Sequence, residues 1–321
     1  PHSGFVIGMK LSDERHTAVL MDLAGTVIAE AQLASGALCQ TTDKILAEVS
    51  TLTRKLLQKS GQSQASISAI GIGLPGIVDA CTGVVKWSPV MTDTEIPLRE
   101  MLQSALGLPV SLDNDTNLLT LAELWFGAGR GISNFAVVTI ERGVGMGLVL
   151  NNRLFRGALG PGMELGHTKV QLDGALCRCG QRGCLEAYVG DYALLREANV
   201  TSGVERHKDL ASLYAAREAG DIMAQSTLDR AGRMFAMGLA NVVNIFDPQM
   251  ILLAGAQLAF GYLSSDKVVH EMRRSVLQVD GPLPEVRVHG WGNKMWAKGA
   301  AAHAIEEISA LRIREVSGHA V

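Results

Sequence analysis

The sequence lacks a long hydrophobic run and a basic opening segment. No stretch reaches the ~18 uninterrupted apolar residues of a membrane helix, so no membrane span is expected. Residues 1–10 lack the basic and then apolar pattern of a secretory signal, so a cytoplasmic location is predicted. The net charge of −3 implies no basic face, which argues against direct nucleic-acid binding by this chain.

The composition also excludes a disordered chain. Apolar residues make up 47% of the sequence and charged residues 19%, which is enough to build a full hydrophobic core. The length of 321 residues exceeds what one core usually supports. Two lobes are therefore expected.

The hydrophobic pattern predicts an α/β fold in which each half begins with strands and continues into helices. Such lobes place ligands at the carboxyl ends of their strands. The boundary between the halves is expected near residues 127–131, where glycines gather. Strands are predicted at residues 5–8, 17–23, 27–32, 69–73, 109–112, 135–140, 148–150 and 250–254, and helices at about 42–60, 117–126, 222–245 and 295–311.

Three of the five cysteines fall within eight residues. In a reducing cytoplasm such a cluster more often holds a metal than a disulfide. Cys177, Cys179 and Cys184 together with His167 would form a closed tetrahedral Zn²⁺ site. A closed site leaves no open coordination position, so a structural ion is expected. The alternative is three free cysteines in a loop.

The stretch from Pro161 to His167, followed by Cys-x-Cys-Gly-x-x-Gly-Cys-x-Glu, resembles the signature of the ROK family of repressors and sugar kinases. Residues 71–79, 114–127 and 251–256 resemble further segments of that family. The resemblance implies a two-lobed actin-like ATPase (ribonuclease H-like) fold with a ligand cleft between the lobes, and a homodimer or homotetramer. It implies lobes at 1–127, joined by a C-terminal helix at about 296–321, and at 128–295.

The same resemblance implies that a hexose or hexose derivative binds to a set of polar residues. In a kinase of this family, Asp115 would be the base that takes the proton from the attacking sugar hydroxyl. Local alternatives remain for these residues, because Asn114 and Asp115 also suit a helix N-terminus and Glu186 suits a first helical turn. Glu164 alternatively lies in a surface loop. The implied sugar-binding residues are Gly76, Asn114, Asp115, Glu164, His167 and Glu186.

Two turns that handle phosphate in the family's kinases differ in this chain. Lys10 stands where those kinases have Asp, and residues 12–14 (Ser-Asp-Glu) replace a Gly-Gly-Thr turn. In the second turn Glu141 places negative charge where phosphate would lie. Binding of ATP and Mg²⁺ is therefore not expected. The alternative is that Lys10 and Arg142 bind phosphate as point charges.

A protein that keeps its sugar-binding residues and loses its phosphate turns is expected to be a sensor. The leading hypothesis is the effector-binding body of a ROK transcriptional regulator of the NagC/XylR type. Because the sequence begins at Pro1, operator DNA would be contacted only through a helix-turn-helix absent from this chain. The alternatives are an ATP-dependent sugar kinase and a body controlled by a protein partner.

Overall fold

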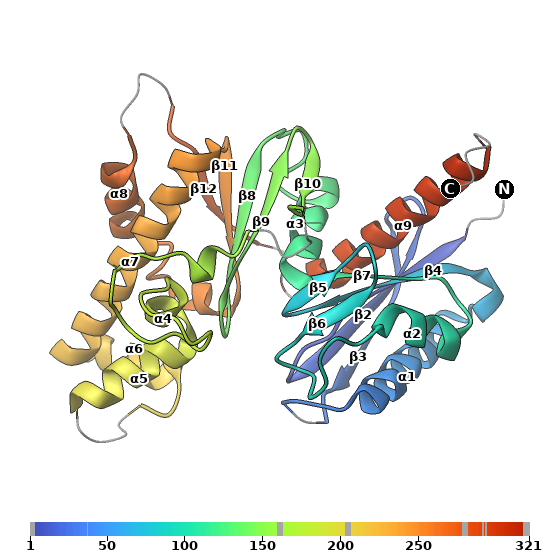
Figure 1. Ribbon diagram of the computed structural model, residues 1–321, viewed down its shortest axis with the longest axis horizontal. Coiled ribbons are helices and arrows are strands. Elements are labelled where there is room, and N and C mark those ends of the chain that lie inside the picture. Colours follow the sequence, from blue (N-terminus) through green and yellow to red (C-terminus); the bar gives the residue numbers. More distant parts are fainter. Residues whose placement is uncertain are drawn as a thin grey trace. The chain divides into compact units, whose positions relative to one another are not determined.

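The computed structural model describes residues 4–36, 38–158, 163–202, 207–277, 282–290, 292 and 294–316. Pro161 and Gly162 of the family-like motif lie outside these residues. The chain divides into two compact units (Figure 1). The first comprises Pro1–Gly131, Asn152–Gly162 and Trp291–Val321, and the second comprises Ile132–Asn151 and Met163–Gly290.

The first unit contains a five-stranded sheet with the order β3-β2-β1-β4-β7. The first three strands form an antiparallel meander, whereas β4 and β7 run parallel to β1. Because these parallel strands are in register, their carboxyl ends share one edge of the sheet, and Leu74 pairs with Asn114 there. The strands are β1 (Phe5–Lys10), β2 (Arg15–Asp22), β3 (Val27–Ala34), β4 (Ile67–Leu74) and β7 (Val110–Asn114).

Side chains alternate between the two faces of this sheet and build two cores. Ile7 of β1 belongs to the core under α1 (Thr42–Ser60) and α2 (Leu98–Leu106), whereas its neighbour Val6 packs with α9 (Lys294–Val316). Helix α3 (Asp115–Phe126) lies against α9. The remaining elements are the turn η1 (Gln64–Ser66) and the hairpin of β5 (Ile77–Asp79) and β6 (Val84–Trp87).

Helix α9 lies directly on the sheet because glycines remove the side chains between them. A Cβ atom on Gly8 would lie 1.9 Å from the Ala297 carbonyl oxygen, and one on Gly71 would lie 1.8 Å from that of Ala300. Both distances are far below any real contact. The two glycines therefore fix how closely α9 approaches β1 and β4.

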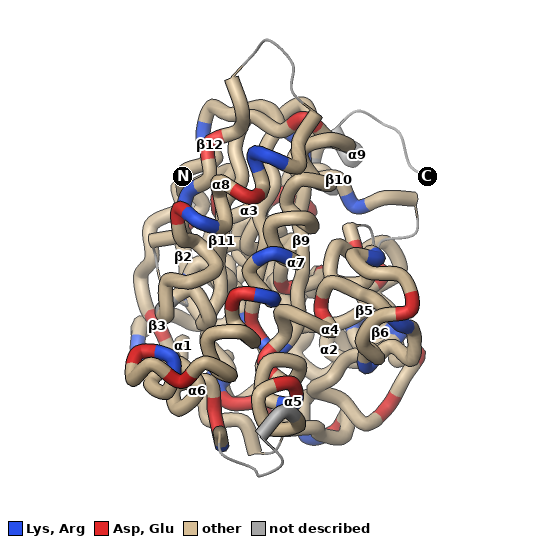
Figure 2. The backbone as a smooth tube through the Cα atoms, turned by 90° about the vertical axis from the view of Figure 1, so that its left-hand side faces the viewer, with Lys and Arg blue, Asp and Glu red and all other residues tan. Residues whose placement is uncertain are grey.

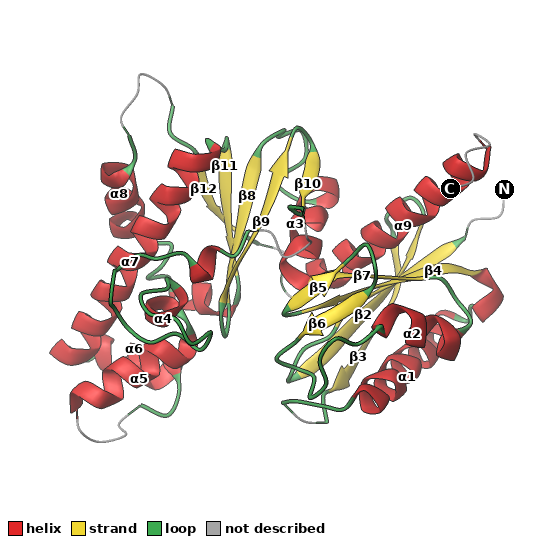
Figure 3. Ribbon diagram, viewed as in Figure 1, coloured by secondary structure: helices red, strands yellow, loops and turns green. Residues whose placement is uncertain are grey.

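The second unit contains β9, β8, β11 and β12 of the sheet with the order β10-β9-β8-β11-β12, whereas β10 (Arg153–Phe155) belongs to the segment Asn152–Gly162 of the first unit (Figure 3). Strands β8, β11 and β12 are parallel, and β9 returns beside β8 in a hairpin. Phe235 and Leu239 of α7 are fully buried in its core. The elements of the second unit are β8 (Phe135–Ile140), β9 (Val144–Leu150), η2 (Leu165–His167), α4 (Glu186–Val189), α5 (Asp191–Ser202), α6 (Leu210–Glu218), α7 (Ile222–Phe246), β11 (Met250–Ala254), η3 (Ala256–Phe260), α8 (Asp266–Ser275) and β12 (Glu285–Val288).

Most predicted elements are present, and several are longer than the sequence indicated. Strand β9 begins at Val144 instead of residue 148, and α3 begins at Asp115 instead of residue 117. Acidic and basic residues are interspersed along the backbone, in keeping with the small net charge (Figure 2). Among the described residues, no helix has both the length and the apolar character needed to span a membrane.

Candidate functional site

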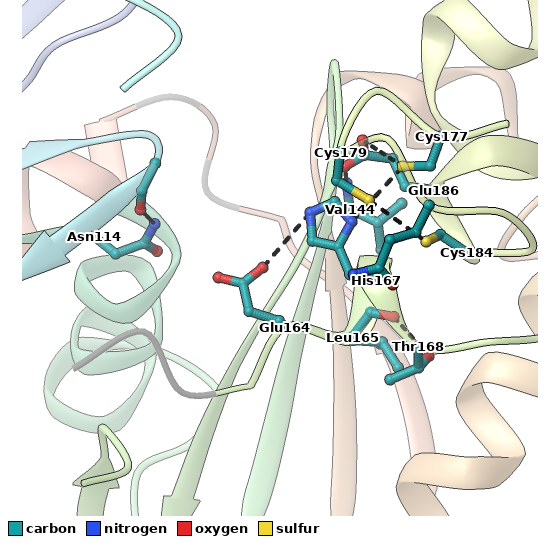
Figure 4. Close-up of polar contacts among 12 residues, drawn as sticks. Asn114, Val144, Glu164, Leu165, His167, Thr168, Cys177, Cys179, Cys184 and Glu186 are labelled. Carbon is teal, nitrogen blue, oxygen red and sulfur yellow. Dashed lines mark hydrogen bonds and ion pairs between the residues drawn. The ribbon is translucent and has the colours of Figure 1, made fainter. Parts of the chain in front are cut away.

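Four side chains of the second unit converge as the cysteine spacing predicted. We call His167, Cys177, Cys179 and Cys184 the metal quartet. Their ligand atoms all lie within 4.8 Å of one another (Figure 4). The Cys179 and Cys184 sulfurs are 3.7 Å apart, and the Cys177 sulfur is 3.7 Å from Nδ1 of His167. Four bonds of about 2.3 Å to a tetrahedral ion separate ligand atoms by about 3.8 Å, so the quartet fits Zn²⁺.

The loop that carries the cysteines is held by its own backbone. The Cys177 N–H donates to the Gln181 carbonyl, and the Gly180 N–H donates back to the Cys177 carbonyl. Gly180 and Gly183 have positive φ angles of 83° and 79°. A Cβ atom on Gly183 would lie 1.8 Å from the Gln171 carbonyl oxygen. Glycine at this position therefore allows the chain to fold back so that the three sulfurs face one another.

Protonation opposes metal binding at one of these cysteines. Burial raises the pKa of the Cys177 thiol to about 11, whereas at the exposed Cys179 the effect of burial is outweighed by the Gln181 N–H and the neighbouring thiols, which lower its pKa. A metal that binds to Cys177 must therefore displace a proton that the buried thiol holds tightly. Metal binding at this quartet should release protons.

Two of the predicted sugar-binding carboxylates lie beside the quartet. His167 directs Nδ1 at Cys177, while its Nε2 lies 3.9 Å from a carboxylate oxygen of Glu164. Partial burial raises the pKa of Glu164, and the nearby Glu186 raises it further, against the lowering effect of His167. Glu164 and Glu186 thus both lie next to the metal quartet, as Figure 4 shows.

Glu186, the first residue of α4, connects three parts of the second unit. One carboxylate oxygen accepts the Val144 N–H at 3.2 Å, at the start of β9. The other lies 3.8 Å from the Cys177 sulfur and 3.5 Å from the Tyr192 hydroxyl. A Cβ atom on Gly143 would lie 2.5 Å from the Glu186 carboxylate, so only glycine leaves room for it there.

In the first unit, Gly76, Asn114 and Asp115 meet at the carboxyl edge of the sheet. The Asn114 side chain caps α3, since its oxygen accepts the N–H groups of Thr116 and Asn117. Its Nδ2 donates to the Gly76 carbonyl at 2.9 Å. The capping alternative for Asn114 is therefore confirmed. Its predicted role in sugar binding remains a prediction.

Two residues at this edge, Asp113 and Arg156, were not predicted from the sequence. Asp113 is buried, and its carboxylate accepts from the Asn114 N–H at 2.7 Å and from Nδ2 of Asn117 at 2.9 Å. Its second oxygen accepts from Nε of Arg156 at 2.7 Å. The one available signal was an acidic residue at the end of an otherwise apolar strand, which implies a partner. Nothing in the sequence identified that partner.

The first altered turn is closed by its own groups. The Ser12 hydroxyl donates to the Arg15 carbonyl at 2.7 Å and accepts the Arg15 N–H at 3.3 Å. The Ser12 N–H donates to Nδ1 of His16, whose Nε2 lies 2.7 Å from the buried Glu48 carboxylate. These backbone donors bind within the protein, so they do not form the open array that holds phosphate.

Lys10 also has a partner within the first unit. It ends β1 and is only 8% exposed, with its ammonium 4.0 Å from the centre of the Trp296 ring. A cation over an indole face is attracted by the ring electrons. Lys10 is thus packed into the protein, which weakens the alternative in which it reaches out to phosphate.

The second altered turn joins β8 to β9 and is tied down from two sides. Within it, the Glu141 N–H donates to the Gly143 carbonyl at 3.0 Å. The buried Gln257 amide donates to the carbonyls of Glu141 and Val189, both at 3.1 Å, and to the Asp191 carboxylate. Burial raises the pKa of Asp191. The Glu141 end of this turn is therefore anchored to a buried amide, while Arg142 is exposed.

Comparisons with known proteins agree with this architecture. The chain is 33% identical to the xylose repressor of Caldicellulosiruptor bescii over 277 residues, which cover 83% of this chain and 69% of the repressor. It is 36% identical to the glucokinase of Thermotoga maritima over 218 residues, covering 62% of this chain and 68% of that enzyme. The crystal structure of a ROK hexokinase from Thermus thermophilus superposes with a TM-score of 0.83 at 29% identity, covering 95% of this chain and 99% of that one.

These similarities establish the fold as the actin-like ATPase fold of ROK sugar kinases and regulators. They include a repressor and two sugar kinases, so they support a sugar-related function without separating the two classes. The model of the ROK family matches residues 6–307, a span that includes the metal quartet and both altered turns. The chain belongs to the ROK family.

Proposed function

We propose that this chain is the sugar-binding effector body of a ROK transcriptional regulator, with no working ATP site. The observation that carries the proposal is the closure of both turns that handle phosphate in the family's kinases. In the first turn, His16 accepts the Ser12 N–H and the Ser12 hydroxyl accepts the Arg15 N–H, and Gln257 anchors the second turn. Phosphoryl transfer depends on electrostatic positioning of phosphate and metal, so closing both turns should remove the activity.

Glu186 also contacts the second turn. Its carboxylate accepts the Val144 N–H, a backbone donor at the end of that turn. One predicted sugar-binding residue therefore occupies a backbone donor of this turn.

In this proposal each unit contributes part of the sugar-binding set. Asn114 and Asp115 supply amide and carboxylate groups from the first unit, and Glu164 and Glu186 supply carboxylates from the second. Such groups bond strongly to sugar hydroxyls, which are both donors and acceptors. His167 would bind Zn²⁺ through Nδ1 and face the sugar through Nε2. The ion would be structural, because four protein ligands fill its coordination sphere.

Further parts of the proposal concern the whole regulator. Sugar binding would move the two lobes predicted from the sequence, which are residues 1–127 with a helix at about 296–321, and residues 128–295. This movement would shift the arrangement of a homodimer or homotetramer. Operator DNA would be contacted through a helix-turn-helix outside this chain. The protein would work in the cytoplasm.

Isothermal titration calorimetry tests the proposal directly. D-Xylose and D-glucose are titrated separately, and ATP–Mg²⁺ is titrated with and without each sugar. We expect heat with at least one sugar and none with ATP–Mg²⁺. Asp115→Asn, which keeps the side-chain size and removes the charge, should abolish the sugar signal. Micromolar binding of ATP–Mg²⁺ together with formation of sugar phosphate would overturn the regulator proposal.

The second candidate function is an ATP-dependent sugar kinase that acts on a hexose. It is supported by Asp115 at the first position of α3, where a base would stand, and by the similarity to glucokinase. A coupled assay for ADP release with D-glucose distinguishes it from the regulator. Turnover that is lost in Asp115→Asn would favour the kinase.

A further inference from the structure

Asp113 controls the geometry of the turn that carries Asn114 and Asp115. It is only 1% exposed, and both of its carboxylate oxygens accept hydrogen bonds. One oxygen binds the Asn114 N–H and the side chain of Asn117, on either side of Asp115 along the chain. The orientation of the turn thus depends on where the Asp113 carboxylate is held.

Arg156 holds that carboxylate from a distant part of the sequence. Its Nε donates to the second oxygen of Asp113 at 2.7 Å, and its side chain is 27% exposed. The segment Asn152–Gly162, in which it lies, belongs to the first unit although the chain on both sides of it belongs to the second. After residue 158 the chain continues to Glu164 and His167.

The other charged groups near this pair make Arg156 the main counter-charge for Asp113. Burial lowers the pKa of His303 of α9, so this imidazole is neutral near pH 7. Glu306 and Glu307 of the same helix interact electrostatically with this cluster as acids. Without the guanidinium, Asp113 would be a buried carboxylate close to further acidic groups, which is a costly arrangement. The carboxylate would have to move, and its hydrogen bond to Asn114 with it.

We propose that Arg156 is a positioning residue for sugar binding. Through Asp113 it keeps the Asn114–Asp115 turn in the orientation that receives sugar hydroxyls. Sugar affinity thereby depends on the segment that contains Arg156 and that precedes Glu164 in the sequence. This inference rests on the proposed function, because it assumes that Asn114 and Asp115 bind sugar.

The test compares Arg156→Ala with Arg153→Ala, a matched control. Arg153 is an exposed arginine of β10, only three residues earlier, so both variants remove one charge from the same segment. Calorimetry with D-glucose and D-xylose measures sugar affinity, and metal content and thermal melting are recorded for every variant. We expect Arg156→Ala to weaken the sugar Kd by at least about tenfold and Arg153→Ala to leave it unchanged.

Rescue separates positioning from a purely structural role. Arg156→Lys, which restores a cation and one donor, should recover most of the affinity. Millimolar methylguanidine should restore sugar binding to Arg156→Ala without raising its melting temperature to that of the wild type. If Arg156→Ala does not fold, Arg156→Lys and Arg156→Gln carry the comparison, with affinity expected to be retained in the first and reduced in the second.

The outcomes distinguish this inference from the proposed function. Wild-type protein that binds neither sugar overturns the proposed function and this inference with it. Wild-type protein that binds a sugar, with the same affinity in the Arg156 variants, overturns the inference alone. Affinity that falls only in proportion to stability, with no rescue by methylguanidine, also overturns it, because the ion pair would then serve folding only.

Discussion

Replacing Cys179 by Ser should lower metal content and sugar affinity together. Cys179 is the exposed cysteine of the metal quartet, whereas Cys177 and Cys184 are buried. Serine keeps nearly the same size, so the change leaves no cavity and acts mainly through the metal. If the ion holds the loop between Glu164 and Glu186, losing it should disturb both carboxylates.

The size of the effect follows from the ligand set. Structural Zn²⁺ sites supply on the order of 10 kcal/mol of binding free energy, which is also local folding free energy. Removing one of four ligands should then cost roughly 2–3 kcal/mol, about a hundredfold in zinc affinity. Apart from the metal quartet itself, the loop contributes few side chains to the hydrophobic core, among them Val170 and Leu185. It depends on the ion more than a well-packed segment would.

The assay compares Cys179→Ser with Cys81→Ser, which alters another exposed cysteine, one that lies outside the metal quartet. Metal content is measured by mass spectrometry after competition with a chelator, and sugar affinity by calorimetry with D-glucose and D-xylose. Cys81→Ser should behave as the wild type. Loss of zinc from Cys179→Ser with unchanged sugar affinity would refute the proposed connection between the metal and the sugar-binding residues.

Two further predictions concern the stability of the first unit. Gly71→Ala should destabilise it by about 3 kcal/mol or more in a denaturant titration, because the new Cβ would lie 1.8 Å from the Ala300 carbonyl oxygen. Gly290→Ala should be nearly neutral in the same titration, because a Cβ atom on Gly290 would have no described atom within 4 Å. Burial lowers the pKa of His303 from 6.5, so below pH 6.5 this residue binds a proton more readily in the unfolded state than in the folded state. Its contribution is therefore fully present above pH 6.5, and stability should fall by up to about 1.4 kcal/mol per pH unit below it. His303→Gln should show a shallower slope of unfolding free energy between pH 6.5 and 5.5, and an unchanged slope would contradict this assignment.

The features that could be predicted from the sequence are those with a short-range signal. A short apolar run predicted β1, which is buried on both faces, and helical hydrophobic patterns predicted α1 and α7. The metal quartet followed from the close spacing of its cysteines. Asn114 was recognisable as a helix cap because it precedes α3 directly.

The features that escaped prediction depend on partners far apart in the sequence. Asp113 and Arg156 are 43 residues apart, and Gln257 reaches a carbonyl 116 residues away. Neither residue type nor spacing indicates such pairs, since they form only after the sheets have placed both ends. The same is true of the return of Asn152–Gly162 to the first unit.

In the second altered turn, the replaced residue does not by itself establish a changed function. Glu141 alone indicates only a repelled phosphate. The structure adds that the backbone of this turn is already engaged, by Gln257 on one side and by Glu186 on the other. Because Glu186 also lies beside Cys177, movement of this carboxylate on sugar binding would be felt by both the turn and the metal loop. A turn built in this way suits the transmission of sugar occupancy better than the binding of a nucleotide. These contacts support the proposed regulator, and the calorimetry with ATP–Mg²⁺ distinguishes it from the kinase.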